Sequence, residues 1–144
     1  MKKILILLLL SITFGLITGC GLNETAGYGV TIISNKIEYA PVIQWIYGLS
    51  DGLAADGTRK QPEEVKDELD AIVVSDDFEI RVTGTVVGNP SYTLFYDDTF
   101  ETVYYRSDKY GRPDDTGSYI LCIEIAFGKA NDYEGYQYWF RLSV

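Results

Sequence analysis

The chain has 144 residues, of which 21 are acidic and 12 are basic, so its formal net charge is −9. This acidity argues that the protein neither binds nucleic acid nor lies flat on anionic lipid, because both functions need a basic surface. The sequence contains no histidine, which excludes Ser-His-Asp and Cys-His catalysis, histidine-ligated zinc and histidine-based pH switches.

The first twenty residues have the organisation of an export signal. Lys2 and Lys3 precede an uncharged, largely apolar run over residues 4–17, which is the order of a secretory n-region and h-region. The run leads into Ile17-Thr18-Gly19-Cys20. This stretch resembles the lipobox of bacterial lipoproteins, in which an aliphatic residue, a small or β-branched residue and a glycine precede a cysteine. An uncleaved signal anchor and an ordinary secreted protein are the alternatives.

The lipobox resemblance implies how and where the protein is held. A lipoprotein signal peptidase would remove residues 1–19, the Cys20 sulfur would carry a diacylglyceryl group, and the new amine would be open to acylation by a fatty acid such as palmitate. Two or more chains anchor a protein stably, since each buried methylene contributes about 0.8 kcal/mol. The implied location is the extracytoplasmic face of the cell membrane, with residues 20–29 as a tether on the order of 20 Å long.

Residues 30–144 are long enough to form one domain with its own core. The chain has two cysteines. Because the implied lipid occupies Cys20, Cys122 has no partner within the molecule, and a disulfide framework is excluded. A free thiol outside the cell is acceptable where it is buried. The tyrosine-rich composition favours β-sheet.

The first part of this domain has the pattern of strands. Residues 30–34 are a β-branched run, and residues 37–39 follow Asn35-Lys36. This pair favours a tight turn, because Asn tolerates positive φ. Residues 42–47 are nearly all apolar, which predicts a strand covered on both faces.

The pattern changes in the middle of the chain. Residues 48–61 are predicted to be the longest irregular stretch, with a turn signal at Asp51-Gly52. Residues 62–72 have the one helical pattern, with Pro62 in the first turn and acidic residues after it. Apolar residues fall on one stripe of this helix, namely Val65, Leu69 and Ile72.

The pattern of the rest of the chain predicts a series of consecutive strands. Residues 78–83, 92–96 and 102–105 read as strands, with turns at Gly88-Asn89-Pro90 and at Asp97-Asp98. The last two predicted strands, in residues 119–127 and 136–144, are long and alternate strictly, with a turn over residues 128–135. The predicted inner face of this hairpin consists of Tyr119, Leu121, Ile123, Ile125, Phe127, Tyr136, Tyr138, Phe140, Leu142 and Val144.

Asp115-Thr116-Gly117-Ser118-Tyr119 resembles the tyrosine corner of immunoglobulin-like domains. There an Asp-x-Gly-x-Tyr stretch precedes the penultimate strand, and the tyrosine hydroxyl bonds to upstream backbone. Leu121 holds the position at which antibody domains have a cysteine. The resemblance implies a mainly β, antiparallel immunoglobulin-like sandwich of about seven strands with one short helix inserted, as in small lipoproteins that carry one such domain. The signal-peptide helix precedes it.

Acidic residues supply the candidate metal and catalytic groups. They are Asp76-Asp77, Asp97-Asp98, Asp114-Asp115, Asp132 and Glu134. Clustered at one end of a sandwich, their oxygens could hold Ca²⁺, although no spacing matches a known calcium loop. Two facing carboxylates could also act as acid and base in a small hydrolase. The alternative is that they are solvated turn residues, for which Asp is favoured.

Aromatic residues supply the candidate binding surface. Trp139 falls on the face of the last strand opposite the apolar stripe, Tyr133 lies in a predicted loop, and Tyr104 is expected to face outward. Exposed aromatic residues stack on sugars or contact a protein partner. The alternative is that the helix or the long loop covers Trp139, since Ile120, Cys122 and Ala126 make this second face partly apolar as well.

Three functions follow from these patterns. The favoured one is a non-enzymatic binding or adhesion module, held at the membrane through Cys20, that recognises an envelope protein. The second is a carbohydrate-binding domain that uses Trp139 and nearby tyrosines, with or without a calcium ion, to bind a glycan. The third is a small carboxylate-based hydrolase.

Overall fold

The structure is a computed structural model and describes residues 29–144 of the chain. The predicted signal peptide in residues 1–19, the lipidation of Cys20 and the tether up to residue 28 lie outside the described residues. Among the residues that are described, no helix is long and apolar enough to span a membrane.

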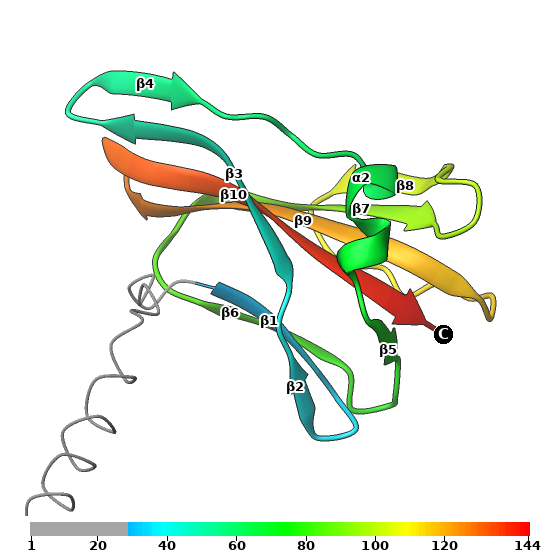
Figure 1. Cartoon of the computed structure of the whole chain (residues 1–144). Coiled ribbons are helices and arrows are strands. Elements are labelled where there is room, and N and C mark those ends of the chain that lie inside the picture. Colours follow the sequence, from blue (N-terminus) through cyan, green and yellow to red (C-terminus); the bar gives the residue numbers. More distant parts are fainter. Residues whose placement is uncertain (1–28) are drawn as a thin grey trace, which may run out of the picture.

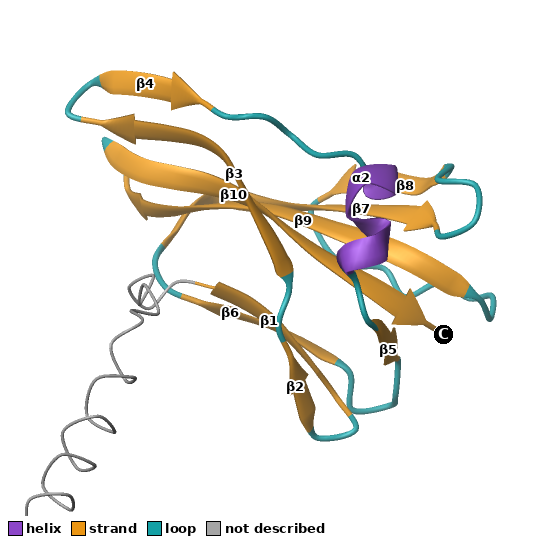
Figure 2. Cartoon of the chain, in the orientation of Figure 1, coloured by secondary structure: helices purple, strands orange, loops and turns teal. Residues whose placement is uncertain are grey.

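The described part of the chain is mainly β, as predicted, but it has ten strands where about seven were predicted, and one short helical segment (Figures 1 and 2). The elements in chain order are β1 (Gly29–Ser34), β2 (Ile37–Tyr39), β3 (Val42–Ser50), β4 (Leu53–Asp56), α2 (Pro62–Val65), the 3₁₀ turn η1 (Lys66–Glu68), β5 (Ala71–Val73), β6 (Glu79–Thr83), β7 (Val86–Tyr96), β8 (Thr102–Ser107), β9 (Ser118–Lys129) and β10 (Asp132–Ser143).

The strands form two sheets. The small sheet has the order β2-β1-β6, and the large sheet has the order β4-β3-β10-β9-β7-β8. These pairings are antiparallel, whereas β5 adds to β10 in parallel through Ile72 and Leu142. Strand β3 borders β10 as far as Trp139, and β5 takes its place from Arg141 onward. The large sheet therefore keeps a neighbour on β10 almost to the chain end, and it curls over the small sheet (Figure 1).

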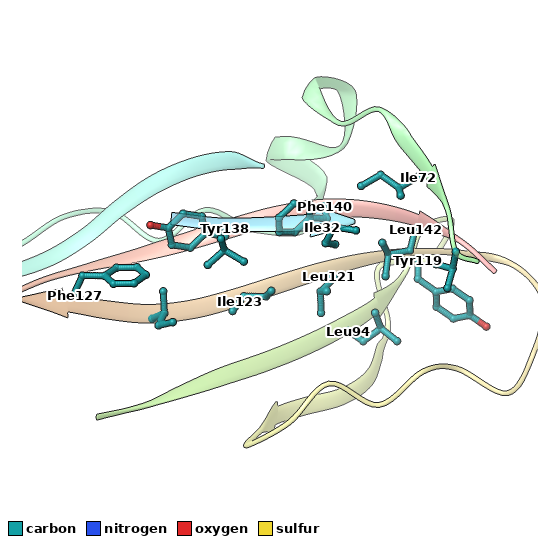
Figure 3. Close-up of a cluster of buried hydrophobic side chains, with 13 residues drawn as sticks. Ile32, Ile72, Leu94, Tyr119, Leu121, Ile123, Phe127, Tyr138, Phe140 and Leu142 are labelled. Carbon is teal, nitrogen blue, oxygen red and sulfur yellow. The ribbon is translucent and has the colours of Figure 1, made fainter. Parts of the chain in front are cut away.

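The main core lies between the two sheets (Figure 3). The alternating residues predicted for the last hairpin do face this core, since β9 and β10 pair in continuous register from Asp132↔Lys129 to Ser143↔Ser118. The small sheet contributes Val30 and Ile32 from β1. Strand β5 contributes Ile72 and strand β7 contributes Leu94. The buried members are Val30, Ile32, Ile72, Val74, Leu94, Tyr119, Leu121, Ile123, Ile125, Phe127, Tyr138, Phe140 and Leu142.

A second, smaller core lies on the opposite face of the large sheet. It consists of Val65 from the helical segment and Leu69, which directly follows that segment, packed on Ile120, Cys122 and Trp139. The partly apolar second face predicted from the sequence is thus covered by this helical segment. Burial of these side chains removes apolar surface from water, which stabilises the segment on the sheet.

The helical segment starts where the sequence predicts and ends earlier. Pro62 is in the first turn, and a capping box joins Gln61 and Glu64. The prediction of a helix to residue 72 is wrong, because Leu69 already has extended backbone angles and Ile72 lies in β5. The apolar spacing is compatible with a helix, but pairing of Ile72 with Leu142 in the large sheet decides the outcome.

Three predicted irregular stretches are strand in the structure. Residues 48–61 contain the end of β3 and all of β4, joined at Asp51-Gly52, where both residues have positive φ. The predicted turn at Gly88-Asn89-Pro90 lies inside β7, at a register shift against β9. The turn predicted over residues 128–135 is reduced to residues 130–131. In β7 the ladder is interrupted between Val87 and Ser91 and resumes beyond it, and in the last hairpin pairing continues to Lys129 and Asp132.

The predicted tyrosine corner is present. The Tyr119 hydroxyl donates a hydrogen bond to the Asp115 carbonyl over 3.0 Å, and burial raises the pKa of Tyr119. The backbones of Gly117 and Val144 exchange two hydrogen bonds of 3.1 and 2.9 Å. The corner therefore fixes the chain end to the start of β9.

Candidate binding site at the edge of the large sheet

Trp139 does not lie on a surface. Its side chain is 1% exposed, stacks on the Phe95 ring at 6.3 Å between centroids, and packs under the helical segment. Its expected place on an exposed face is therefore wrong, and the alternative that the helix covers it is correct. Cys122 is buried beside it, and burial raises the pKa of the Cys122 thiol well above its ordinary value.

The other two predicted surface tyrosines are only half-exposed. Tyr133 lies in β10 and packs edge-on against Tyr47, with 6.2 Å between ring centroids. Tyr104 packs on the main core, and its hydroxyl accepts a hydrogen bond from the Gly111 N–H over 3.4 Å. The expectation that Tyr104 faces outward is wrong, because the neighbouring Tyr105 occupies that position and is 67% exposed.

Asp97, Asp98 and Asp115 line one pocket, but the acidic groups do not all gather at one end of the domain. Asp115 precedes β9 and Asp132 follows it, so a strand of twelve residues separates them. Asp77 instead accepts hydrogen bonds from the Asn35 and Lys36 N–H groups at the β1–β2 turn. Within residues 29–144, no three acidic or cysteine side chains form a group that could hold a metal ion. The calcium site predicted from these pairs is therefore not assembled there.

Strand β8 is one edge of the large sheet, and β7 is the neighbour it pairs with. Its solvent face presents Val103 and Tyr105. The Arg106 guanidinium lies over the Tyr105 ring, 5.2 Å from the centroid. Residues 106–112 contain three basic residues and one acidic residue in an otherwise acidic protein. This edge thus combines aromatic surface, positive charge and unpaired backbone groups.

A small cleft adjoins the β8 edge on the face that carries the helical segment. We call residues 57–61 the strap, because this segment crosses the sheet from β4 to the helix. The space between the strap and the sheet, which we call the cleft, has a volume of about 100 Å³. Its walls include Arg59, Thr93, Tyr105, Arg106, Glu124 and Gln137.

The strap is held in place through its backbone. The Gly57 N–H donates to the Ile46 carbonyl over 2.8 Å, and the Lys60 N–H donates to the Gln137 side-chain oxygen over 2.9 Å. Glycine is required at residue 57, since a Cβ there would lie 2.5 Å from the Trp45 ring and 2.9 Å from its carbonyl oxygen. These contacts position Arg59 over the sheet.

The charged groups of the cleft are unequally paired. Glu124 accepts from the Arg59 Nε over 3.3 Å and from the Gln137 amide over 3.2 Å. Arg106 forms no ion pair within the described part of the chain. Its backbone N–H donates to the Thr93 hydroxyl over 3.2 Å, and its φ is 48°. The one carboxylate of the cleft is thus paired, whereas the Arg106 guanidinium lies over the Tyr105 ring and has no carboxylate partner among the described residues.

Trp139 and Cys122 also line the cleft. The indole Nε1 of Trp139 is buried and has no hydrogen-bond partner among the described residues. Most buried polar groups in proteins are hydrogen-bonded, so such an exception calls for an explanation. The cleft therefore has more hydrogen-bond donors than acceptors.

Comparison of the chain with models of known protein families, with curated proteins and with solved structures finds no significant match. The chemistry of the site therefore rests on its own geometry. Sequence patterns alone did not single out Tyr105, Arg106 or Arg59. The available signal was the concentration of basic residues in residues 106–112.

Proposed function

We propose that this chain is a lipid-anchored extracytoplasmic protein that binds an envelope protein without catalysing a reaction. The observation that carries the proposal is the β8 edge, where Tyr105 is exposed beneath the Arg106 guanidinium. Tyrosine and arginine are among the residues that contribute most to protein–protein binding. The mode of binding is addition of an extended partner segment to β8.

An edge strand is a template for such a segment. Its unpaired N–H and C=O groups bind a further strand through main-chain hydrogen bonds, while side-chain contacts give specificity. The opposite edge, β4, is also exposed, but it has four residues, of which two are alanine. Strand β8 is longer and carries the aromatic and cationic side chains, so we place the partner there.

Charge complementarity defines the partner's chemistry. The basic residues 106–112 lie at the end of β8, whereas the whole chain has a net charge of −9. A basic surface on an acidic protein attracts an acidic segment and repels a basic one, which steers association and selects partners. The proposed partner segment is therefore extended and acidic.

The anchor is supported by the lipobox resemblance at Ile17-Thr18-Gly19-Cys20. Strand β1 begins at Gly29, so eight residues separate Cys20 from the folded domain. A tether of this length keeps the domain close to the membrane. We infer that the partner is itself a membrane or membrane-proximal protein.

The immunoglobulin-like assignment belongs to the same proposal. It is supported by the tyrosine corner at Tyr119 and by the order β7-β9-β10, which corresponds to the C-F-G order of immunoglobulin sheets. The β3–β4 hairpin beside β10 and the helical segment are additions to that plan. We infer that the domain is an elaborated relative of this sandwich.

Site-specific photo-crosslinking in cells tests the binding proposal. A crosslinking amino acid at Tyr105 is expected to trap one envelope protein, and the same group at Leu53 on the β4 edge, which is 78% exposed, is the matched control. Equal capture at both positions, or none at Tyr105, would overturn the assignment of β8. Capture of glycan instead of protein would favour the carbohydrate-binding alternative.

Metabolic labelling with a fatty-acid analogue tests the anchor. The parent protein is expected to take up the label, and Cys20→Ser is expected to lose it. Continued labelling of the Cys20→Ser variant would overturn lipidation at this residue.

A further inference from the structure

We propose that the cleft beneath the strap binds an oxyanion group, a carboxylate or a phosphate, carried by the ligand of the β8 edge. This inference rests on the proposed function, and it adds the chemical group that the ligand presents. The cleft lies beside Tyr105 and Arg106, so one ligand can occupy β8 and the cleft together.

The first argument is the composition of the cleft walls. Two guanidinium groups, those of Arg59 and Arg106, line a cleft that has one carboxylate, Glu124. Glu124 bonds to the Nε of Arg59, and the Arg106 guanidinium has no carboxylate partner among residues 29–144. A planar guanidinium presents parallel N–H donors that match a carboxylate or phosphate in bidentate fashion. The free donors thus fit an oxyanion.

The second argument is the unpartnered indole of Trp139, which is independent of the arginines. Trp139 lines the cleft and also a second pocket bounded by Leu69 and Phe140, is 1% exposed, and its Nε1 has no acceptor in the described part of the chain. Burial of a donor without an acceptor is unfavourable. An oxyanion, or a water molecule held by one, supplies the missing acceptor.

The third argument is the backbone of Arg106. Its φ of 48° lies in the left-handed region, which is unfavourable for a residue with a side chain. The Thr93 hydroxyl holds this conformation by accepting the Arg106 N–H. Strained residues that are fixed by their surroundings occur often at ligand-binding sites. Here the conformation fixes the start of the side chain beside the cleft.

The size of the cleft limits what enters. Its volume of about 100 Å³ accommodates a carboxylate or phosphate group. The cleft is therefore a subsite for the anionic head of a ligand that continues along β8.

Binding of simple anions to the full-length protein in detergent tests the inference. The probes are N-acetylglycine for a carboxylate, methyl phosphate for a phosphate, and the neutral N-acetylglycine amide as the matched control. Binding is followed by nuclear magnetic resonance of the two indole N–H groups, assigned with Trp45→Phe. We expect one or both anions to shift the Trp139 signal, while the amide does not, and their relative affinities identify the source of the oxyanion.

Three variants make the test specific to the cleft. Arg106→Gln is expected to weaken anion binding about tenfold, the loss of one charge-assisted hydrogen-bonding group, and Glu124→Gln is expected to strengthen it by removing a repelling charge. Arg112→Gln, outside the cleft, is the control for net charge. No shift with either anion, or equal loss in the Arg106 and Arg112 variants, would overturn the inference.

The outcome is separable from that of the proposed function. Crosslinking at Tyr105 that persists in Arg106→Gln, together with no anion binding, would reject the cleft and retain β8 as the partner-binding edge. Anion binding without any crosslink at Tyr105 would reject the protein partner and leave a site for a small anionic ligand.

Discussion

Replacement of Asp97 by alanine is expected to lower the free energy of unfolding by about 2 kcal/mol. Asp97 lies at the turn between β7 and β8 and is buried, and its Oδ2 accepts hydrogen bonds from Arg141 Nη2 over 2.6 Å and from Arg141 Nε over 3.2 Å. Lys66 Nζ lies 3.6 Å from Oδ1 and donates to the Asp97 carbonyl over 2.7 Å. One carboxylate thus joins the helical segment, β10 and the β7–β8 turn.

The magnitude follows from the exposure of the partners. Removal of one member of a fully buried ion pair costs about 3–5 kcal/mol, because the other charge is left without compensation. The side chains of Arg141 and Lys66 are 31% and 29% exposed, so water partly replaces the lost carboxylate. We therefore expect a loss of about 2 kcal/mol in the free energy of unfolding, which is less than for a fully buried pair. For a domain of this size, this loss corresponds to a decrease in Tm of about 8 °C.

Urea denaturation followed by tryptophan fluorescence measures the change. The neighbouring Asp98 is exposed and has no ion pair among the described residues, so Asp98→Ala is the matched control, with an expected change within about 0.5 kcal/mol. The double variant Asp97→Ala/Arg141→Ala is expected to lose less than the sum of the single losses. Similar unfolding free energies for the Asp97 and Asp98 variants would refute the reasoning.

Three further predictions concern other parts of the domain. Hydrogen bonds from the Ser75 side chain and from the Asn35 and Lys36 N–H groups lower the pKa of Asp77, so the ionised carboxylate stabilises the fold at any pH above the ordinary pKa of Asp. Denaturation curves should show this stabilisation disappearing as the pH falls below about 4. Asp77→Asn should abolish this part of the pH dependence. Burial raises the pKa of the Cys122 thiol, so a thiol reagent should modify Cys122 only as the domain unfolds, measured in Cys20→Ser protein, where Cys122 is the one remaining cysteine. Immediate modification of Cys122 in the native state would contradict its burial. Gly135→Ala places a Cβ 2.3 Å from the Tyr47 ring, which should destabilise the domain by about 1–3 kcal/mol, whereas Gly29→Ala, with no atom within 4 Å, should leave its melting temperature unchanged.

Local patterns predicted the parts of the fold in which one signal dominates. Asn35 and Lys36 form the expected turn, since both have positive φ. The last hairpin is correct in face and register because period-two alternation extends over the whole of it. Tyr119 makes the corner hydrogen bond that its motif implies. In these places, the residues that specify the structure are close in sequence.

The candidate site was not predicted, because its position depends on contacts between distant residues. The alternation of side chains along the last strand correctly placed Trp139 on the second face of the sheet, but it does not show what covers that face. In β8, register shifts against β7 determine that Tyr104 faces the core while Tyr105 faces solvent. The alternation within the predicted strand 102–105 is too short to show which of the two tyrosines faces the core. Arg59 and Arg106 are 47 positions apart in the sequence, so no local pattern joins them.

The position of the cleft follows from how the two faces of the large sheet are covered. One face packs on the three-stranded sheet, with which it forms the main core. The other face is covered by a segment of seven helical residues, which reaches Ile120 and Trp139. At the next cross-strand pair on this face of the hairpin, Gln137↔Glu124, the cover changes from apolar side chains to the backbone of the strap. A backbone crossing over polar residues cannot close the surface as tightly as interlocking apolar side chains do. The cleft therefore forms where the helical cover ends, and β8 brings Arg106 to that point.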